Sequence, residues 1–168
     1  MEPLIPSLGA NSSDPARCAM AKIYIASKAK HRPRWRALRD SGVNINSRWI
    51  DTPDLYIGTT AGDGVSDLDY EKLWIQCIED VINCDMLILY VEPGEVLKGA
   101  LVEVGAALAA GRMVIACADL DGIEGIGTWW NHPLVEVIPS RSIGEVMGYF
   151  NGQEKRVPSP AEHSEDSA

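Results

Sequence analysis

The segment from residue 99 to residue 111 consists of small and aliphatic residues and holds a single charged side chain, Glu103. Its composition predicts a helix. A buried carboxylate is costly unless something compensates it. We expect Glu103 in or near the first helical turn, where backbone N–H groups and the helix dipole favour an anion. An ionised carboxylate in an apolar wall is the group that covalent glycosyl transfer requires.

Glycosidic chemistry also uses a second acid, which protonates or hydrogen-bonds the leaving base. The sequence offers Asp80, Asp85, Glu92 and Glu95. Asp85 begins a predicted strand at the far end of the sheet, so we interpret it as structural. We take Asp80 as the candidate acid, and Glu92 and Glu95, in the turn before the Gly/Ala helix, as candidate substrate-binding residues. The alternative for all three is a solvated surface acid.

Basic residues are concentrated in the loop and helix that follow the first predicted strand. Six of the fifteen Lys and Arg residues lie between 28 and 39. Ser27, Lys28 and Lys30 are nearest the strand end and are candidates for binding a 5′-phosphate. The arginines at 34, 36 and 39 are better interpreted as an exposed helix face.

Two aromatic residues are further candidates. Trp49 closes the second predicted strand and could stack on a base, although core packing is the alternative. Tyr24 lies in the first strand, where its hydroxyl could approach a sugar. We therefore include Tyr24 among the candidate catalytic residues and Trp49 among the substrate-binding ones.

Strands and helices alternate along the chain. Apolar runs and period-two patterns predict strands, and apolar positions at helical spacing predict helices. The strands are expected at 22–26, 43–49, 86–91, 112–118 and 134–138, and the helices at 33–42, 67–81, 99–111 and 140–150. This order predicts an α/β, Rossmann-like three-layer fold with a parallel five-stranded sheet. Ligands of such sheets bind at the carboxyl ends of the strands, where the loops that begin at Ser27, Asp51 and Glu92 would meet.

Composition divides the chain into one domain and two tails. Residues 1–20 are expected to form a disordered leader, residues 21–151 a single domain, and residues 152–168 a disordered tail. The Gly- and Pro-containing segment from Asp51 to Ser66 is expected to be a long flexible loop.

Several classes of protein and site are disfavoured by the sequence. A net charge of −9 argues against a nucleic-acid polymer as partner. Neither a membrane span nor a signal peptide is present, and the four cysteines are expected to be free, three of them inside apolar elements, which indicates a cytoplasmic protein. Dinucleotide, phosphate-loop and metal-binding spacings are absent, so we expect no cofactor and no metal.

Four segments carry a resemblance to a known family. They are Lys22-Ile-Tyr-Ile-Ala-Ser27, Asn46-Ser-Arg-Trp-Ile50, Glu79-Asp80-Val-Ile-Asn-Cys-Asp85, and the helix with the pattern Gly99-x3-Glu103-x-Gly105-x-Ala107-x-Ala109-x-Gly111. Together they resemble the nucleoside 2-deoxyribosyltransferase-like family, which includes nucleoside 5′-monophosphate N-glycosidases. The similarity extends from residue 22 to residue 118, and its last motif is the most specific.

This resemblance implies a flavodoxin-like fold and cleavage of an N-glycosidic bond. It implies that Glu103 attacks the sugar C1′ to give a glycosyl-enzyme, which water or a second base resolves, and that Gly99 starts the nucleophile helix beside the substrate. It also implies a homo-oligomer. The chain departs from the family at Cys77, where an Asp is common, and at Glu92 and Glu95, where the turn often holds an Asp. The alternative is a non-catalytic nucleotide-binding or regulatory module on the same fold.

Overall fold

The computed structural model describes residues 21–52, 67–119 and 127–150 of the 168-residue chain. The leader predicted at 1–20, most of the loop predicted at 51–66, and the tail predicted at 152–168 lie outside the described residues.

The centre of the fold is a parallel sheet of four strands. The strands are β1 (Ile23–Ala26), β2 (Met86–Tyr90), β3 (Met113–Cys117) and β4 (Val135–Ile138), hydrogen-bonded in that order. Side chains on both faces of β1 and β2 are almost completely buried, as the continuous apolar runs predict for a covered parallel strand.

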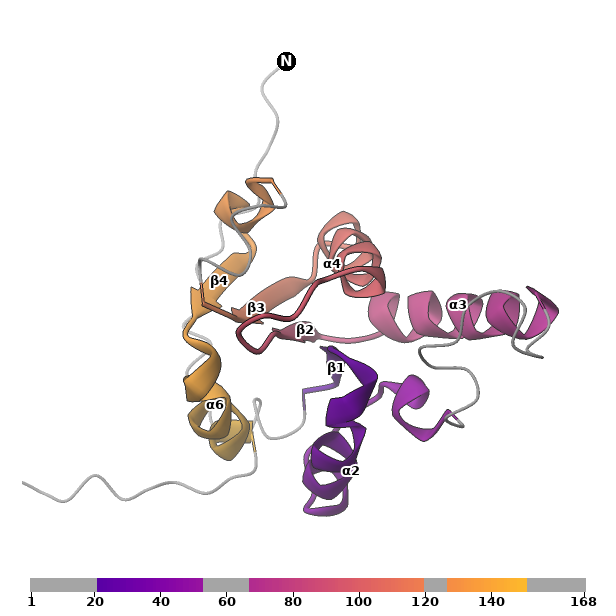
Figure 1. Cartoon of the computed structure of the whole chain (residues 1–168), viewed down its shortest axis with the longest axis horizontal. Helices are drawn as coiled ribbons and strands as arrows, with labels where there is room; N and C mark the ends of the chain where they lie inside the picture. The colour runs from indigo at the N-terminus through magenta and orange to yellow at the C-terminus, as the bar shows by residue number, and fades with distance from the viewer. Residues whose placement is uncertain (1–20, 53–66, 120–126, 151–168) are drawn as a thin grey trace, which may run out of the picture.

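Helices cover both faces of this sheet. The helices are α2 (Arg32–Asp40), α3 (Asp67–Ile82), α4 (Gly99–Ala109) and α6 (Ile143–Phe150). Figure 1 shows α3 and α4 on one side of the sheet and α2 and α6 on the other. The predicted α/β class, the parallel sheet and the order of these elements are therefore confirmed. Gly42, expected to end the first helix, has a φ of 107°, which glycine adopts most readily.

The strand predicted at 43–49 is present only as an isolated bridge between Ile45 and Ile23, so a fifth strand is not confirmed. Beyond Ile45 the chain turns into the short 3-10 helix η2 (Arg48–Asp51). Side chains then bond the open edge of β1: the Ser47 hydroxyl accepts the Ile25 N–H at 2.6 Å, and the Trp49 indole donates to the Ile25 carbonyl at 2.8 Å. The alternation of apolar and polar residues at 43–49 therefore reflects side chains that are buried beside β1, and not a full strand.

A second polar group fixes this segment from the opposite side. The Asp80 carboxylate accepts hydrogen bonds from the backbone N–H of Arg48, at 2.9 Å, and from its guanidinium, at 2.7 Å. Asn46 donates to the backbone carbonyl of Asp80 at 2.8 Å. These bonds hold residues 46–48 against α3 and away from an extended path.

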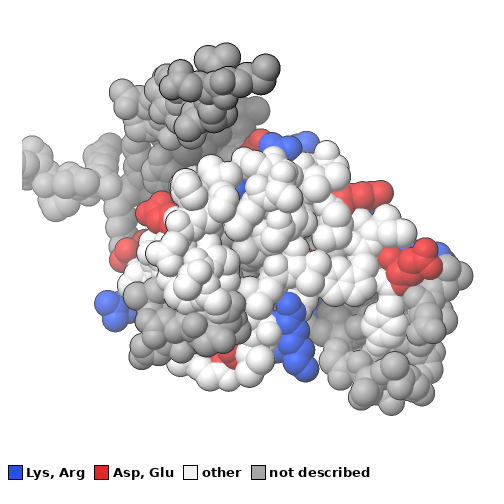
Figure 2. All heavy atoms as spheres, turned by 90° about the horizontal axis from the view of Figure 1, so that it is seen from above, with Lys and Arg blue, Asp and Glu red and all other residues white. Residues whose placement is uncertain are grey.

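The outer surface on the α4 side is largely uncharged. Figure 2 views this side and shows a broad area without charge, with Lys, Arg, Asp and Glu mainly toward its margins. Exposed apolar side chains on the two helices include Ile75 and Ile82 of α3 and Val102 of α4. In the described part of the chain, no helix has the length and apolar character needed to cross a membrane.

Replacing Ser47 by Ala should lower the free energy of unfolding by about 1–3 kcal/mol, because the buried N–H of Ile25 loses its acceptor. Ser41→Ala is the matched control, since Ser41 is exposed, and it should change stability by less than about 0.5 kcal/mol. Urea unfolding followed by circular dichroism measures both. Equal effects of the two substitutions would contradict this account of the β1 edge.

Candidate functional site

A pocket of about 320 Å³ lies beside the carboxyl end of β1. Its wall is formed by residues 27–29 after β1, by Trp49 and Thr52 around η2, by one face of α3, and by residues 96–100 and Glu103 at the start of α4. This is the edge of a parallel sheet at which ligands bind. All three segments that the sequence expected to meet contribute to this wall. They begin at Ser27, at Asp51, which contributes Thr52, and at Glu92.

Glu103 lies on this wall and is only 9% exposed. The hydroxyl of Tyr24, 79 residues earlier on β1, donates a hydrogen bond of 2.7 Å to its Oε1. Burial raises the pKa of Glu103 from 4.5 to about 7, although the bond from Tyr24 acts in the opposite direction. Near neutral pH the carboxyl group is therefore divided between its protonated and ionised forms.

The structure corrects the expected source of compensation for this charge. Glu103 is the fifth residue of α4, and the first turn of the helix contains no acidic residue. The helix N-terminus is therefore not its main partner, and the phenol of Tyr24 supplies the hydrogen bond instead. Tyr24 was expected near the sugar, and the structure brings it directly to Glu103.

Cys77 of α3 is a third member of this buried group. Its side chain lines the pocket, is 6% exposed and interacts electrostatically with Glu103. Burial, with a further contribution from Glu103, raises the pKa of the Cys77 thiol to about 12. Burial and the same carboxylate also raise the pKa of Tyr24 far above its usual range. Both groups therefore remain protonated and neutral beside Glu103.

Four of the predicted substrate-binding residues line the pocket: Ser27, Lys28, Trp49 and Gly99. The Ser27 hydroxyl accepts a hydrogen bond of 2.8 Å from Trp35, which fixes its position. Trp49 is 8% exposed, so it serves the core as well as the wall. A methyl group at Gly99 would approach the ring of Trp74 to 3.0 Å, so the ring would have to shift by a few tenths of an ångström to accept it.

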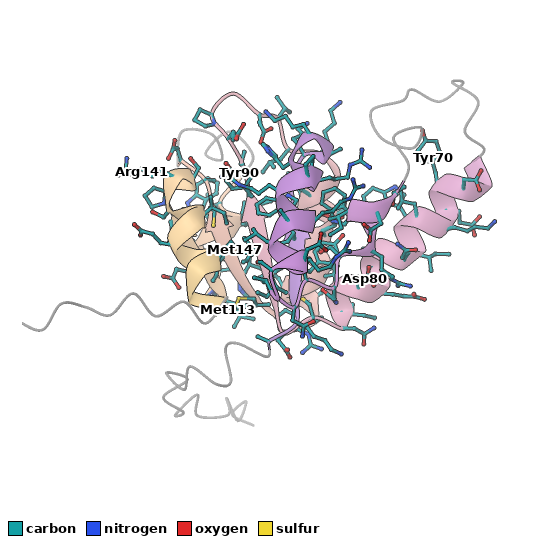
Figure 3. All side chains as sticks on the ribbon, turned by 90° about the horizontal axis from the view of Figure 1, so that it is seen from below. Tyr70, Asp80, Tyr90, Met113, Arg141 and Met147 are labelled. Atoms are coloured by element: carbon teal, nitrogen blue, oxygen red, sulfur yellow. The ribbon has the colours of Figure 1, made fainter. Side chains whose placement is uncertain are left out.

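Asp80 lies away from the pocket wall, and both of its carboxylate oxygens accept hydrogen bonds from Arg48. Figure 3 shows Asp80 and Tyr70 toward opposite ends of α3, and Tyr70 is the one that lines the pocket. Asp80 therefore positions residues 46–48 in this structure. It is not among the described residues that line the pocket, so no contact with the cavity supports its prediction as a catalytic acid.

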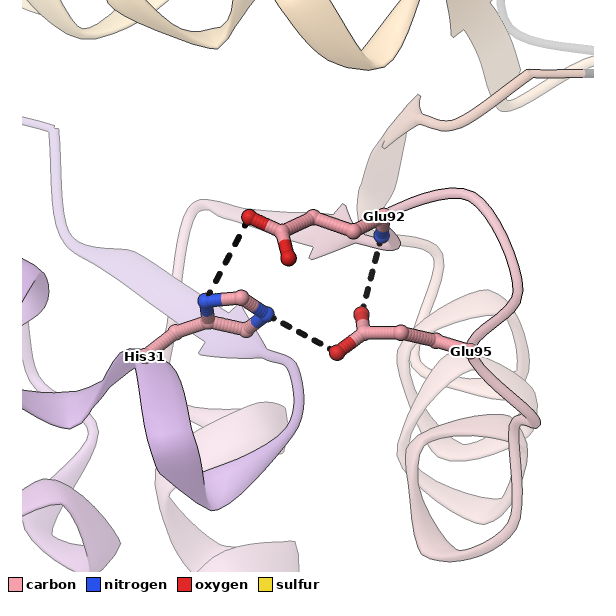
Figure 4. Close-up of side chains that lie close together, drawn as sticks. All are labelled: His31, Glu92 and Glu95. Atoms are coloured by element: carbon pink, nitrogen blue, oxygen red, sulfur yellow. Dashed lines mark hydrogen bonds and ion pairs between the residues drawn. The ribbon is translucent and has the colours of Figure 1, made fainter.

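His31, Glu92 and Glu95 form a separate cluster, drawn in Figure 4, and Lys30 binds both of its carboxylates. The Lys30 ammonium lies 3.1 Å from Glu92 and 2.9 Å from Glu95, and His31 Nε2 lies 3.0 Å from Glu95. These bonds lower the pKa of Glu92; in Glu95 they outweigh the opposing effect of burial, so its pKa is lowered as well. The cluster joins the loop after β1 to the loop before α4.

The same cluster contains the donor set that best fits a metal ion in the described part of the chain. One ligand atom from each of His31, Glu92 and Glu95 lies within 4.8 Å of the others. The Lys30 ammonium, however, already pairs with both carboxylates, at 3.1 Å from Glu92 and 2.9 Å from Glu95. We therefore interpret the cluster as a clamp between loops.

Several residues that line the pocket were missed by sequence reasoning, among them Tyr70, Trp74 and Lys98. Trp74 belongs to the helix predicted at 67–81; its side chain is 40% exposed and forms part of the wall. Lys98 immediately precedes α4 and also lines the pocket. Its position directly before the helix was the available signal. Within the described residues, neither Lys28 nor Lys98 has an ion-pair partner.

Comparison with known proteins adds no identification: no protein-family model matches the chain, and no curated protein matches it either.

The raised pKa of Glu103 predicts a pH-dependent effect on stability. Between pH 4.5 and 7 the folded protein keeps the Glu103 proton that the unfolded chain releases, so stability is lost as the pH rises through this range. Glu103→Gln should therefore be more stable than the wild type by up to about 3 kcal/mol at pH 8, and close to it near pH 4.5. Urea unfolding at both pH values measures the difference.

Glu145→Gln is the control, because Glu145 is exposed on α6. Its effect should be small and nearly the same at pH 4.5 and pH 8. A Glu103→Gln variant whose advantage does not grow with pH would show that Glu103 titrates in the folded protein as it does in the unfolded chain.

Proposed function

We propose that this protein cleaves the N-glycosidic bond of a nucleoside or nucleoside 5′-monophosphate through a covalent glycosyl intermediate on Glu103. One observation carries the proposal: a buried carboxylate, held by a phenol, forms part of a pocket at the ligand-binding edge of a parallel sheet. In this proposal the chain belongs to the nucleoside 2-deoxyribosyltransferase-like family. Its substrate carries either ribose or deoxyribose.

The proposed reaction has two steps. An oxygen of ionised Glu103 forms a bond to the sugar C1′, the C1′–N bond breaks, and its electron pair leaves with the base. Water or a second base then attacks C1′ and releases the carboxylate, which gives hydrolysis or transfer respectively. The Tyr24 hydrogen bond orients the nucleophile and stabilises its ionised form.

The rest of the wall suits a nucleotide. Trp49, Trp74 and Tyr70 offer aromatic surface for a base. Lys28 and Lys98 supply positive charge for a 5′-phosphate, and the Ser27 hydroxyl lies on the same wall. Lys30 was also predicted for this role, but its ammonium group forms ion pairs with Glu92 and Glu95 instead.

The finer fold assignment is part of the proposal. If the Ile45 bridge counts as the edge of the sheet, the segments follow the order of a flavodoxin-like fold. The exposed apolar side chains on α3 and α4 support a homo-oligomer that covers them. The buried free thiols of Cys77, Cys84 and Cys117 support a reducing compartment such as the cytoplasm.

The alternative function is a non-catalytic nucleotide-binding or regulatory module. Two observations favour it: Cys77 occupies the wall beside Glu103, where the resemblance leads one to expect an acid, and Asp80 is bonded to Arg48. Such a module would keep the pocket and bind nucleotides without turnover.

Incubation with nucleosides and their 5′-monophosphates should release free base, detected by chromatography. The panel should include ribose and deoxyribose sugars and purine, pyrimidine and pyridinium bases, each with and without an acceptor base. Glu103→Gln should reduce the rate by at least about 100-fold, because the nucleophile is lost. Nucleotide binding without base release from any member, unchanged in Glu103→Gln, would favour the non-catalytic module.

The same assay tests the phosphate subsite. A 5′-monophosphate should be preferred over its nucleoside, and Lys28→Ala should remove most of that preference. Lys22→Ala is the matched control, because Lys22 is exposed at the amino end of β1, opposite the pocket. An equal loss of preference in both variants would assign the effect to overall charge.

A further inference from the structure

Among the residues that the structure describes, few acids that could protonate a leaving base line this pocket. Among the described residues that line it, Glu103 is the only carboxyl group. Glu103 is also the proposed nucleophile, which must be ionised to attack. The other proton donors on the described wall are the thiol of Cys77, the phenol of Tyr70 and the ammonium groups of Lys28 and Lys98, which give up protons less readily than a carboxylic acid.

The remaining predicted acids have structural partners elsewhere. Asp80 accepts hydrogen bonds from the Arg48 backbone and guanidinium. Glu92 and Glu95 bind the Lys30 ammonium. Moving any of these carboxyl groups into the cavity would break bonds that hold a loop, so they are poor candidates for a mobile acid.

Cys77 faces the cavity where a second acid would be useful. Its thiol has a pKa raised to about 12 by burial and by Glu103, so it is a weak proton donor. The described part of the wall therefore offers the proposed nucleophile, three aromatic side chains and two ammonium groups, but little general-acid chemistry.

The need for an acid depends on the charge of the base. A neutral base leaves through a nitrogen that gains an electron pair and becomes anionic, so it needs a proton in the transition state. A base that already carries a positive charge at the glycosidic nitrogen, such as a pyridinium, leaves as a neutral molecule. The electron pair of the C1′–N bond cancels its charge, and no proton has to be supplied.

We infer that the substrate of this pocket is a nucleotide or nucleoside whose base is cationic, a pyridinium or an N-alkylated purine; the inference rests on the proposed function of Glu103. The aromatic rings of Trp49, Trp74 and Tyr70 suit a flat cation. Lys28 and Lys98 suit the phosphate of the same molecule.

Each step of this reaction balances with groups that are present. A Glu103 oxygen bonds to C1′ while the C1′–N pair returns to the ring, giving a neutral base and a glycosyl ester. Water then adds to C1′, the ester oxygen leaves as the Glu103 carboxylate, and the water proton passes to solvent. Only the ionised form of Glu103 is required.

Two matched pairs of substrates test the inference on the wild-type protein. Nicotinamide mononucleotide is compared with adenosine 5′-monophosphate, and 7-methylguanosine 5′-monophosphate with guanosine 5′-monophosphate; the second pair differs by one methyl group and the charge that it creates. The cationic member of each pair should release base at least about 100-fold faster than the neutral one. This factor is the rate contribution that a general acid, absent from the described wall, would make to the departure of the neutral base. Glu103→Gln should abolish the release.

The pH profile supplies an independent readout. With nicotinamide mononucleotide, whose pyridinium charge does not titrate, kcat/KM should rise as Glu103 ionises, through a pH of about 7, and then stay level, because no acid has to remain protonated. Guanosine 5′-monophosphate cleaved as fast as its methylated form, or a kcat/KM for nicotinamide mononucleotide that falls again at high pH, would overturn the inference and leave the proposed function intact. No base from any of the four nucleotides would overturn the inference, and the proposed function would fall with it only if no other nucleoside or nucleotide of the wider panel released base.

Discussion

The hydrogen bond between Tyr24 and Glu103 is the interaction on which the candidate site depends. It joins β1 to α4 across 79 residues and gives the buried carboxyl group of Glu103 a direct hydrogen-bond partner. Burial favours the protonated form of Glu103 and the phenol favours its anion, and the resulting pKa of Glu103 is about 7. The proposed nucleophile is thus partly ionised at neutral pH, and its ionisation destabilises the fold.

The surrounding structure holds that pair in place with polar bonds outside the pocket. Ser47 and Trp49 bond the edge of β1, which carries Tyr24, and Asp80 fixes the segment that contains them. On the other side, Lys30 and His31 bind Glu92 and Glu95 and so fasten the loop before α4, which carries Glu103. Acids that look catalytic in the sequence therefore position the two elements that carry Tyr24 and Glu103.

Hydrophobic pattern was sufficient to predict four strands, four helices and the edge where the pocket lies, because burial on a sheet or helix face repeats along the chain. It also picked out Glu103, since a lone charge in an apolar helix stands out. The pattern failed at 43–49, where side chains replace a backbone ladder. It could not distinguish Asp80 from a pocket acid or find Trp74 and Lys98, because those roles depend on contacts between distant segments.

The central claim is that Glu103 forms a covalent bond to the sugar, and mass spectrometry of the protein after reaction tests it most directly. A substrate analogue with fluorine at the sugar 2′ position should be used, because the electron-withdrawing fluorine slows hydrolysis of the glycosyl ester. The account predicts release of one equivalent of base and a gain in mass equal to the fluorinated sugar or its phosphate, confined to the peptide that contains Glu103. Base release with that peptide unmodified, or with the label on another residue, would contradict it.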